Sequence, residues 1–331
     1  MINKQVKLSS KVYEKDIEKF PTRNGYGEGL VMAGENDDNV VVLCADLTES
    51  TRSQAFKEKY PLRFVEIGVA EQLLATVASG MASYGKIPFI SSYAAFSPGR
   101  NWEQIRTSIA YNDVPVNIAG AHTGISVGPD GATHQALEDI ATMRSIPNMI
   151  VVSPCDAIEA RKVTVEAAKN NKPTYMRFKK HSTPVFTTED TPFKIGQAEV
   201  FWESRDPKVL IVATGPLVHE ALLAAKKLNS SKIGSVVVNC HTVKPIDERT
   251  LIKYAKLAGA VVTVEEHQVN GGLGSAVSEV LAKNFPVPME FIGMQDTFGE
   301  SGEPAQLLRK YKMKSVNIVT ASKSVIRRKT R

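Results

Sequence analysis

Cysteine and long apolar runs are scarce in this sequence. Its 331 residues include three cysteines, Cys44, Cys155 and Cys240, in apolar strand-like stretches without the paired spacings of metal sites or disulfide frameworks. No stretch approaches the roughly 18 apolar residues of a membrane-spanning helix, and the first 20 residues lack the apolar segment of a signal peptide. We therefore expect a reduced, cytoplasmic protein with no membrane association and no metal site of its own.

A concentrated basic surface is also missing. The 41 Lys and Arg residues exceed the 35 Asp and Glu residues, which gives a formal net charge of +6, but they are spread along the chain except in the closing segment 323–330. Nucleic-acid binding is therefore not expected, and a diffuse positive field suits phosphorylated metabolites.

Short apolar runs alternate with amphipathic stretches from about residue 39 to residue 179. Such alternation predicts a mostly parallel sheet covered by helices on both faces. Residues 181–196 interrupt the pattern with Pro, Thr and acidic side chains and read as a linker, after which the alternation resumes. The predicted fold class is α/β with two doubly wound domains, a larger one over 1–185 and a smaller one over 195–331.

Polar and aromatic residues follow the predicted strands at the edge where ligands bind in such sheets. Glu71 comes shortly after the run 63–68 and opens a helical stretch, and Tyr93 and Phe96 end the run 87–96. From the residues alone, Glu71 could serve only to complement a helix N-terminus, and the two aromatic residues could belong to the core.

The segment 63–96 resembles the pyrimidine-binding domain of transketolases. The resemblance implies that Glu71 hydrogen-bonds the aminopyrimidine of thiamine diphosphate and drives it to the imino tautomer, which deprotonates the thiazolium to the ylid. A partly buried setting is expected for this carboxyl group. Tyr93 and Phe96 match the aromatic wall of the cofactor pocket, and Asp46 matches a residue beside the cofactor and the subunit contact.

The loop 120–148 is the most distinctive segment, because His122 and His134 bracket a Gly-rich turn that contains Asp130. In transketolases the matching loop contacts the sugar. The resemblance implies that His134 binds oxygens near the reacting carbon of the donor, that Asp130 accepts a bond from a sugar hydroxyl, and that His122 lies further toward the phosphate end.

Arg23 and Ser50 match family positions that hold the substrate phosphate. A second phosphate-binding Arg of many transketolases is absent, and Lys179, Lys180 and His181 stand in this region instead. We expect Lys180 to supply the cation, with less fixed geometry than an Arg fork gives.

The second domain also matches the family, where it lies away from the chemistry, so we expect structural roles for its residues. The family's Gly-Asp-Gly motif for diphosphate and Mg²⁺ is missing. The resemblance therefore implies a C-terminal transketolase subunit of the pentose phosphate pathway that needs an N-terminal partner to supply the Mg²⁺ ligands. An α2β2 heterotetramer with thiamine diphosphate at the interfaces and sugar phosphates as substrates is expected.

Three alternatives remain at this stage. Half of a 1-deoxyxylulose 5-phosphate synthase would use a similar loop, and the β-type subunit of a 2-oxo acid dehydrogenase shares the two-domain architecture. A scaffold subunit without catalytic activity is the third. The paired histidines and Asp130 favour a transketolase.

Overall fold

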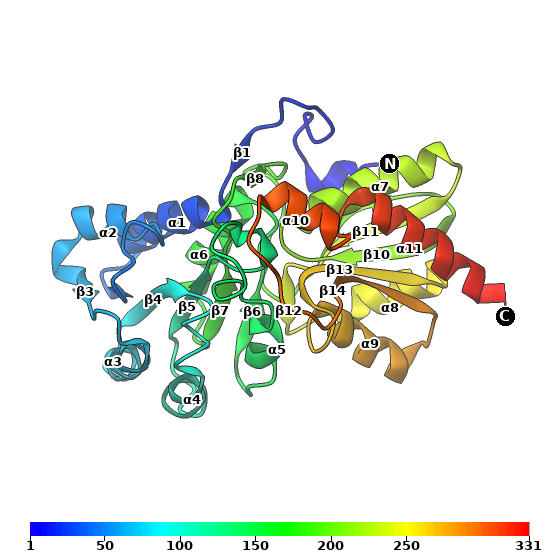
Figure 1. Cartoon of the computed structure of the whole chain (residues 1–331). Coiled ribbons are helices and arrows are strands. Elements are labelled where there is room, and N and C mark those ends of the chain that lie inside the picture. Colours follow the sequence, from blue (N-terminus) through cyan, green and yellow to red (C-terminus); the bar gives the residue numbers. More distant parts are fainter. Residues whose placement is uncertain (331) are drawn as a thin grey trace.

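The computed structural model describes residues 1–330. Most of these residues belong to two α/β units, each of which contains one open sheet covered by helices (Figure 1). The larger sheet contains, in spatial order, β12 (Thr242–Lys244), β6 (Ile150–Val152), β7 (Thr174–Arg177), β5 (Asn117–Ala121), β4 (Ile87–Tyr93), β2 (Val40–Cys44) and β3 (Phe64–Glu66). The smaller contains β14 (Met289–Met294), β13 (Val261–Gln268), β10 (Pro207–Ala213), β11 (Gly234–Asn239) and β9 (Glu199–Glu203). A separate antiparallel pair joins β1 (Lys19–Phe20) to β8 (Thr183–Pro184).

Both sheets are mostly parallel, as the continuous apolar runs predict. In the described residues, only β12 in the larger sheet and β9 in the smaller pair antiparallel to their neighbours. All five residues of β2 are buried, which is why its sequence shows no alternation of apolar and polar side chains. The predicted α/β class with two doubly wound sheets is confirmed.

Helices cover both faces of each sheet. Those of the first half are α1 (Thr22–Asn36), α2 (Gln54–Lys59), α3 (Glu71–Ser83), α4 (Trp102–Gln104) with a π-helical turn over Ile105–Ala110, α5 (Asp139–Arg144) and α6 (Ala157–Ala167). Those of the second half are α7 (Leu217–Ser230), α8 (Glu248–Ala258), α9 (Leu273–Asn284), α10 (Pro304–Lys310) and α11 (Ser315–Arg327). Single 3-10 turns lie at Lys4–Val6, Pro61–Arg63, Ile125–Val127 and Arg328–Thr330. No helix of residues 1–330 combines the length and apolar character that crossing a bilayer requires.

Apolar side chains fill three cores between these layers. Leu74 of α3 and Ile140 of α5 pack on one face of the larger sheet, in a core that continues to Leu273 of α9 in the second half. Leu30 of α1 and Val163 of α6 pack on the opposite face. A third core lies under α7 and α11. Because one core crosses the boundary between the halves, the two sheets are parts of one packed unit.

The chain crosses between the halves in both directions. β12 comes from the second half but joins the edge of the larger sheet beside β6. Val6, Val12 and Ile17, which the sequence analysis assigned to the first domain, pack in the core of the smaller sheet. The predicted boundaries at 185 and 195 therefore do not separate the contacts of the two halves.

Candidate functional site

Glu71 is the first residue of α3, and its side chain is only 3% exposed. Its Oε2 accepts a bond of 3.1 Å from Nη1 of Arg100, and Ser92 Oγ lies 3.4 Å from Oε1. Asn101 Nδ2 donates to the backbone oxygen of Glu71 at 2.9 Å and so fixes the start of the helix. The buried setting expected for this carboxyl group is present, and Arg100 is its counter-ion.

Four rings form a cluster that Arg100 connects to this carboxyl group. Tyr93 stacks on Phe96 with 5.8 Å between ring centroids, and His122 lies 3.8 Å from the Tyr93 centroid. His134 meets the edge of Phe96 at 5.5 Å. The Arg100 guanidinium lies 4.0 Å from the Phe96 centroid while it bonds Glu71, so it joins the ring cluster to the carboxyl group. The structure thus brings together Glu71 and the two aromatic residues that the sequence paired with it.

His122 is fully buried at the end of β5 and has a left-handed backbone with φ of 58°. Such a conformation is uncommon outside glycine and often marks a functional position. Burial, and then the nearby charge of Arg23, lowers the pKa of His122 to about 3, so its ring is neutral. Arg23 Nη1 lies 3.3 Å from Nε2 and can only donate, so Nε2 accepts and Nδ1 carries the hydrogen. Within residues 1–330 this Nδ1 has no hydrogen-bond partner.

A cavity of about 710 Å³ opens beside these rings. Its lining includes Arg23, Asp46, Ser50, Arg52 and Lys180. Arg23 Nη1 donates to the backbone oxygen of Ser50 at 2.7 Å, and the Ser50 hydroxyl lies 2.7 Å from the Tyr93 hydroxyl. The cavity therefore contains the residues expected to hold a substrate phosphate, within hydrogen-bond distance of the ring cluster.

Asp46 lies on an exposed turn directly after β2, with φ of 57°. Its backbone nitrogen donates to Oε1 of Glu66 at 2.8 Å. The side chain is at the cavity lining with Arg23 and Ser50, so the structure groups Asp46 with the expected phosphate-binding residues.

Three consecutive residues after β7 have different surroundings. Lys180 Nζ pairs with Oδ2 of Asp130 at 2.7 Å, and both side chains are about one-third exposed. Lys179 is 2% exposed and pairs with Glu266 of the second half at 2.9 Å. His181 is mostly buried, and its Nδ1 has no partner in the described part of the chain. Of these three residues, Lys180 is the one that lines the cavity.

Sequence reasoning missed Arg100 and Arg52. Arg52 lines the cavity with φ of 69° and donates from Nε to Oδ1 of Asn24 at 2.9 Å. Neither arginine belongs to a spacing pattern that a single sequence reveals. Their positive charge among acidic and aromatic neighbours was the available signal.

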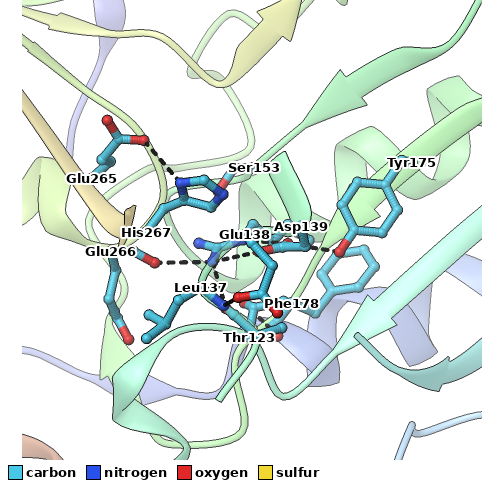
Figure 2. Close-up of polar contacts among 12 residues, drawn as sticks. Thr123, Leu137, Glu138, Asp139, Ser153, Tyr175, Phe178, Glu265, Glu266 and His267 are labelled. Atoms are coloured by element: carbon cyan, nitrogen blue, oxygen red, sulfur yellow. Dashed lines mark hydrogen bonds and ion pairs between the residues drawn. The ribbon is translucent and has the colours of Figure 1, made fainter. Parts of the chain in front are cut away.

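The second half of the chain directly contacts the loop that carries Asp130 and His134. Glu266, at the end of β13, accepts bonds from the backbone nitrogen and the hydroxyl of Ser126 at 2.8 and 2.5 Å. Figure 2 shows Glu266 near Leu137, together with the neighbouring Glu265 and His267. The expectation that the second domain lies away from this region is therefore wrong in one respect, because a buried polar network joins it to the loop.

Residues that could hold a metal do not cluster in this part of the protein. Among residues 1–330 there is no group of three or more His, Cys, Asp or Glu side chains arranged to bind an ion. The three cysteines are buried and free. The acidic residues of the cavity, Asp46, Glu49 and Glu66, share it with two arginines and two lysines.

The family comparisons match both halves of the chain. Residues 18–185 match the pyrimidine-binding domain of transketolase, and residues 196–318 match the transketolase C-terminal domain. The chain belongs to the transketolase family, whose members depend on thiamine diphosphate.

Several relatives are themselves partial transketolases. A Methanocaldococcus jannaschii protein described as a transketolase C-terminal section is 43% identical over 292 residues, which cover 87% of this chain and 91% of the relative. The 6-deoxy-6-sulfo-D-fructose transketolase subunit SqwH of a Clostridium species is 38% identical, with 96% and 98% covered. A solved structure described as a split gene transketolase in an inactive β4 tetramer has a TM-score of 0.85 and 41% identity, with 94% and 99% covered. Rat transketolase is 34% identical over 93% of this chain, which spans 49% of that enzyme.

Proposed function

We propose that this chain is the C-terminal subunit of a split, cytoplasmic transketolase that transfers a two-carbon ketol unit from a ketose phosphate to an aldose phosphate. The observation that supports the proposal most directly is the buried carboxyl group of Glu71, which Arg100 joins to the stacked rings of Tyr93 and Phe96, in a member of the transketolase family. The relatives named above are transketolases or parts of them, which favours this reaction over those of the synthase and dehydrogenase alternatives.

The environment of Glu71 fits an aminopyrimidine. The guanidinium of Arg100 is flat, lies 4.0 Å from the centroid of the Phe96 ring and donates a hydrogen bond of 3.1 Å to Glu71. A flat group with nitrogen atoms at its edge therefore fits between Phe96 and Glu71. An aminopyrimidine likewise offers a flat face, and a ring nitrogen at its edge can form a hydrogen bond with the carboxyl group of Glu71. When bound, thiamine diphosphate supplies the nucleophilic carbon that breaks and forms the carbon–carbon bond of the sugar.

The remaining residues would bind and orient the sugar. Thr133 Oγ1 lies 2.9 Å from Nδ1 of His134, which orients the ring and leaves Nε2 for oxygens near the reacting carbon. Asp130 would accept a hydrogen bond from a hydroxyl group of the sugar. Arg23 and Lys180 would bind the anion at the far end, as a fork and a point charge respectively. His122, which bonds Arg23, would act at this same end.

A partner subunit would complete the enzyme. The chain spans about half the length of full transketolases and lacks the Gly-Asp-Gly motif, so the Mg²⁺ ligands and diphosphate contacts would come from an N-terminal subunit. The similar split gene protein is described as an inactive β4 tetramer, which supports the need for a second kind of subunit. An α2β2 assembly would place two copies of each chain around the cofactors.

The decisive experiment mixes this chain with a purified N-terminal subunit, thiamine diphosphate and Mg²⁺. Two-carbon transfer from a ketose phosphate to ribose 5-phosphate should appear only when both subunits are present. A 6-sulfo ketose tests whether the donor anion resembles that of the named Clostridium relative, and pyruvate tests the synthase and dehydrogenase alternatives. Turnover of pyruvate without ketol transfer would overturn the proposal.

A further inference from the structure

The loop 123–137 carries Asp130 and His134, and its own backbone closes its base and forms short turns at Gly128, Gly131 and His134. Thr123 forms an isolated bridge with Ala136, and Gly124 N donates to Ala136 O at 2.8 Å. The loop beyond this base is long and Gly-rich, so its conformation depends on what packs against it. Much of that packing comes from the second half of the chain.

Glu266 makes the most concentrated of these contacts. Its carboxylate is 2% exposed, and Oε1 accepts from the nitrogen and the hydroxyl of Ser126 and from Nζ of Lys179. Lys179 Nζ also donates to the backbone oxygen of Thr123 at 2.9 Å. Burial raises the pKa of Glu266, but Lys179 and its other donors outweigh burial and leave the pKa lowered, so the carboxylate is ionised. One buried ion pair therefore contacts the loop at two places.

The same ion pair adjoins the expected phosphate-binding residues. Lys179 N donates to Thr22 Oγ1 at 2.7 Å, and Arg23 N donates to Lys179 O at 3.4 Å. The next residue, Lys180, points to the cavity and pairs with Asp130. Fixing Lys179 against Glu266 thus fixes the backbone on which Lys180 and the start of α1 depend.

A second segment, 298–303, supports the loop from another side. Gln135 Nε2 donates to Ile125 O and to Glu300 O, both at 3.0 Å. A Cβ atom at Gly131 would lie 2.5 Å from the hydroxyl oxygen of Ser301, so loop and segment are in close contact. Arg177 Nη2 donates to both Ala136 O and Glu266 O, at 3.2 and 2.9 Å.

We propose that Glu266 is a positioning residue for sugar binding: through Ser126 and Lys179 it sets the conformation of the loop 123–137 and the placement of Lys180. The inference rests on the proposed role of that loop. Glu266 is not itself a contact of the sugar, because its carboxylate is enclosed by Ser126 and Lys179. Through Glu266, the second half of the chain would therefore affect the affinity for the sugar.

Glu265 offers a matched control on the same strand. It is fully buried like Glu266, but its carboxylate points to the opposite face and accepts from Leu273 N and Gly274 N at the start of α9, at 2.7 and 2.8 Å. Glu265→Gln therefore removes an equally buried carboxylate that does not bond the loop.

Hydrogen exchange on the chain alone tests the inference without any activity. Glu266→Gln and Ser126→Ala should raise amide exchange in 123–137 about tenfold or more, since each weakens a bond to a charged group. Glu265→Gln should leave exchange in this loop unchanged and raise it at the start of α9. If the Glu266→Gln protein does not fold, hydrogen exchange of the Ser126→Ala protein alone tests the inference. Unchanged loop exchange, or an equal rise with Glu265→Gln, would overturn the inference.

Kinetics of the assembled enzyme provide the second test. The KM for the donor sugar should rise about tenfold in Ser126→Ala and Glu266→Gln, while the dissociation constant of thiamine diphosphate stays within about twofold. A general loss of structure would weaken both. Equal losses in sugar and cofactor affinity would contradict a positioning role. Absence of ketol transfer by the unmodified complex would refute the proposed function and leave the exchange result standing.

Discussion

At the scale of single residues, the surroundings of Glu71 determine what its carboxyl group can do. The group is almost inaccessible to solvent, yet it has a charged donor in Arg100 and a hydroxyl neighbour in Ser92. A buried carboxylate without such partners would be strongly destabilising. Because Arg100 is half exposed and also lies over Phe96, it is the movable member of this group, and a bound ring would have to displace it.

Glu71→Gln keeps the size of the side chain and removes its ability to exchange a proton. We expect two-carbon transfer by the assembled enzyme to fall by about 10²- to 10⁴-fold, the usual contribution of a positioned acid or base. Transfer rates with a ketose phosphate donor, together with thermal unfolding, measure the effect.

The control for this prediction is Glu103→Gln. Glu103 is an exposed carboxylate on α4, and its replacement should leave the transfer rate unchanged. A Glu71→Gln enzyme with more than about half of the original rate would remove Glu71 from the chemistry.

At the scale of elements, the packing of α1 against α6 holds Arg23 over the cavity. Glycines make this close approach feasible, because a Cβ atom at Gly25 would lie 1.9 Å from the backbone oxygen of Ala157, and one at Gly29 would lie 2.6 Å from Cβ of Thr164. Arg23 is the second residue of α1, so any shift of the helix moves its guanidinium.

Gly25→Ala should therefore destabilise the protein by about 1 to 3 kcal/mol through overpacking and weaken sugar binding through Arg23. Gly80→Ala is the matched change, since Gly80 is in the exposed part of α3 and an added Cβ there would meet no neighbouring group within 4 Å. It should stabilise by up to about 1 kcal/mol through helix propensity. Urea unfolding of both variants measures the two effects, and a stable Gly25→Ala protein would show that the two helices can separate.

The elements that could be predicted are those with continuous apolar runs. The runs 39–47 and 173–179 contain β2 and β7, and α8 and α9 lie in the predicted amphipathic stretches. The helix α1 was missed because its glycines and mixed polarity give it almost no amphipathic pattern. β12 was missed because three residues are too short to show one.

For the candidate site, the sequence predicted some residues and gave no signal for others. Glu71, Tyr93 and Phe96 follow strands that end at one edge, so topology alone brings them together. The bonds of Arg100 to Glu71 and of Glu266 to Ser126 join residues 29 and 140 positions apart, and single-sequence patterns carry no signal for such pairs. Side-chain pairing across loops depends on packing that only the folded chain defines.

At the scale of the whole molecule, buried neutral histidines couple stability to pH. Burial lowers the pKa of His122 and His241 to about 3, and that of His181 and His267 to about 4. Below about pH 6.5 these histidines bind protons in the unfolded chain but stay neutral in the folded protein. Lowering the pH therefore lowers the free energy of unfolding. Two buried carboxyl groups act in the opposite direction, because burial raises the pKa of Glu159 and Glu265 to about 7 and the folded state binds their protons first.

Burial lowers the pKa of these histidines by more in total than it raises the pKa of the two carboxyl groups, so the unfolding free energy should fall as the pH is lowered from about 6.5 to 4.5. His241→Asn removes one of these histidines and should flatten the dependence by about 1.4 kcal/mol per pH unit. Denaturant titrations across this range measure both slopes. An identical slope in the variant would show that His241 protonates in the folded protein.

Exposed apolar residues lie on both sides of Glu71, where the proposed function leads us to expect contact with another subunit. Val69 is 68% and Leu73 51% exposed, and both lie within two positions of the buried carboxyl group. Surface of this kind is covered in stable assemblies.

Leu73→Asp should weaken association, with the partner subunit or with a second copy, by about 10- to 100-fold, as expected for the loss of one buried leucine. Sedimentation of the mixed subunits measures this change. Leu257→Asp is the comparison, because Leu257 is similarly exposed on α8 of the second half. Equal effects of both variants would show that charge alone, and not this location, disturbs assembly.

The crossing of β12 into the larger sheet has a consequence for any attempt to divide the protein. If the chain were cut in the stretch 187–195 and the fragments were separated, the amino-terminal fragment would lose the edge strand that covers β6 and the surface that Val6, Val12 and Ile17 contact. The amino-terminal fragment would then present an unpaired strand edge and bare apolar side chains, both of which favour aggregation. A cleaved linker should therefore leave two fragments that stay bound to each other and melt together, and neither fragment should be recoverable as a monomer by itself.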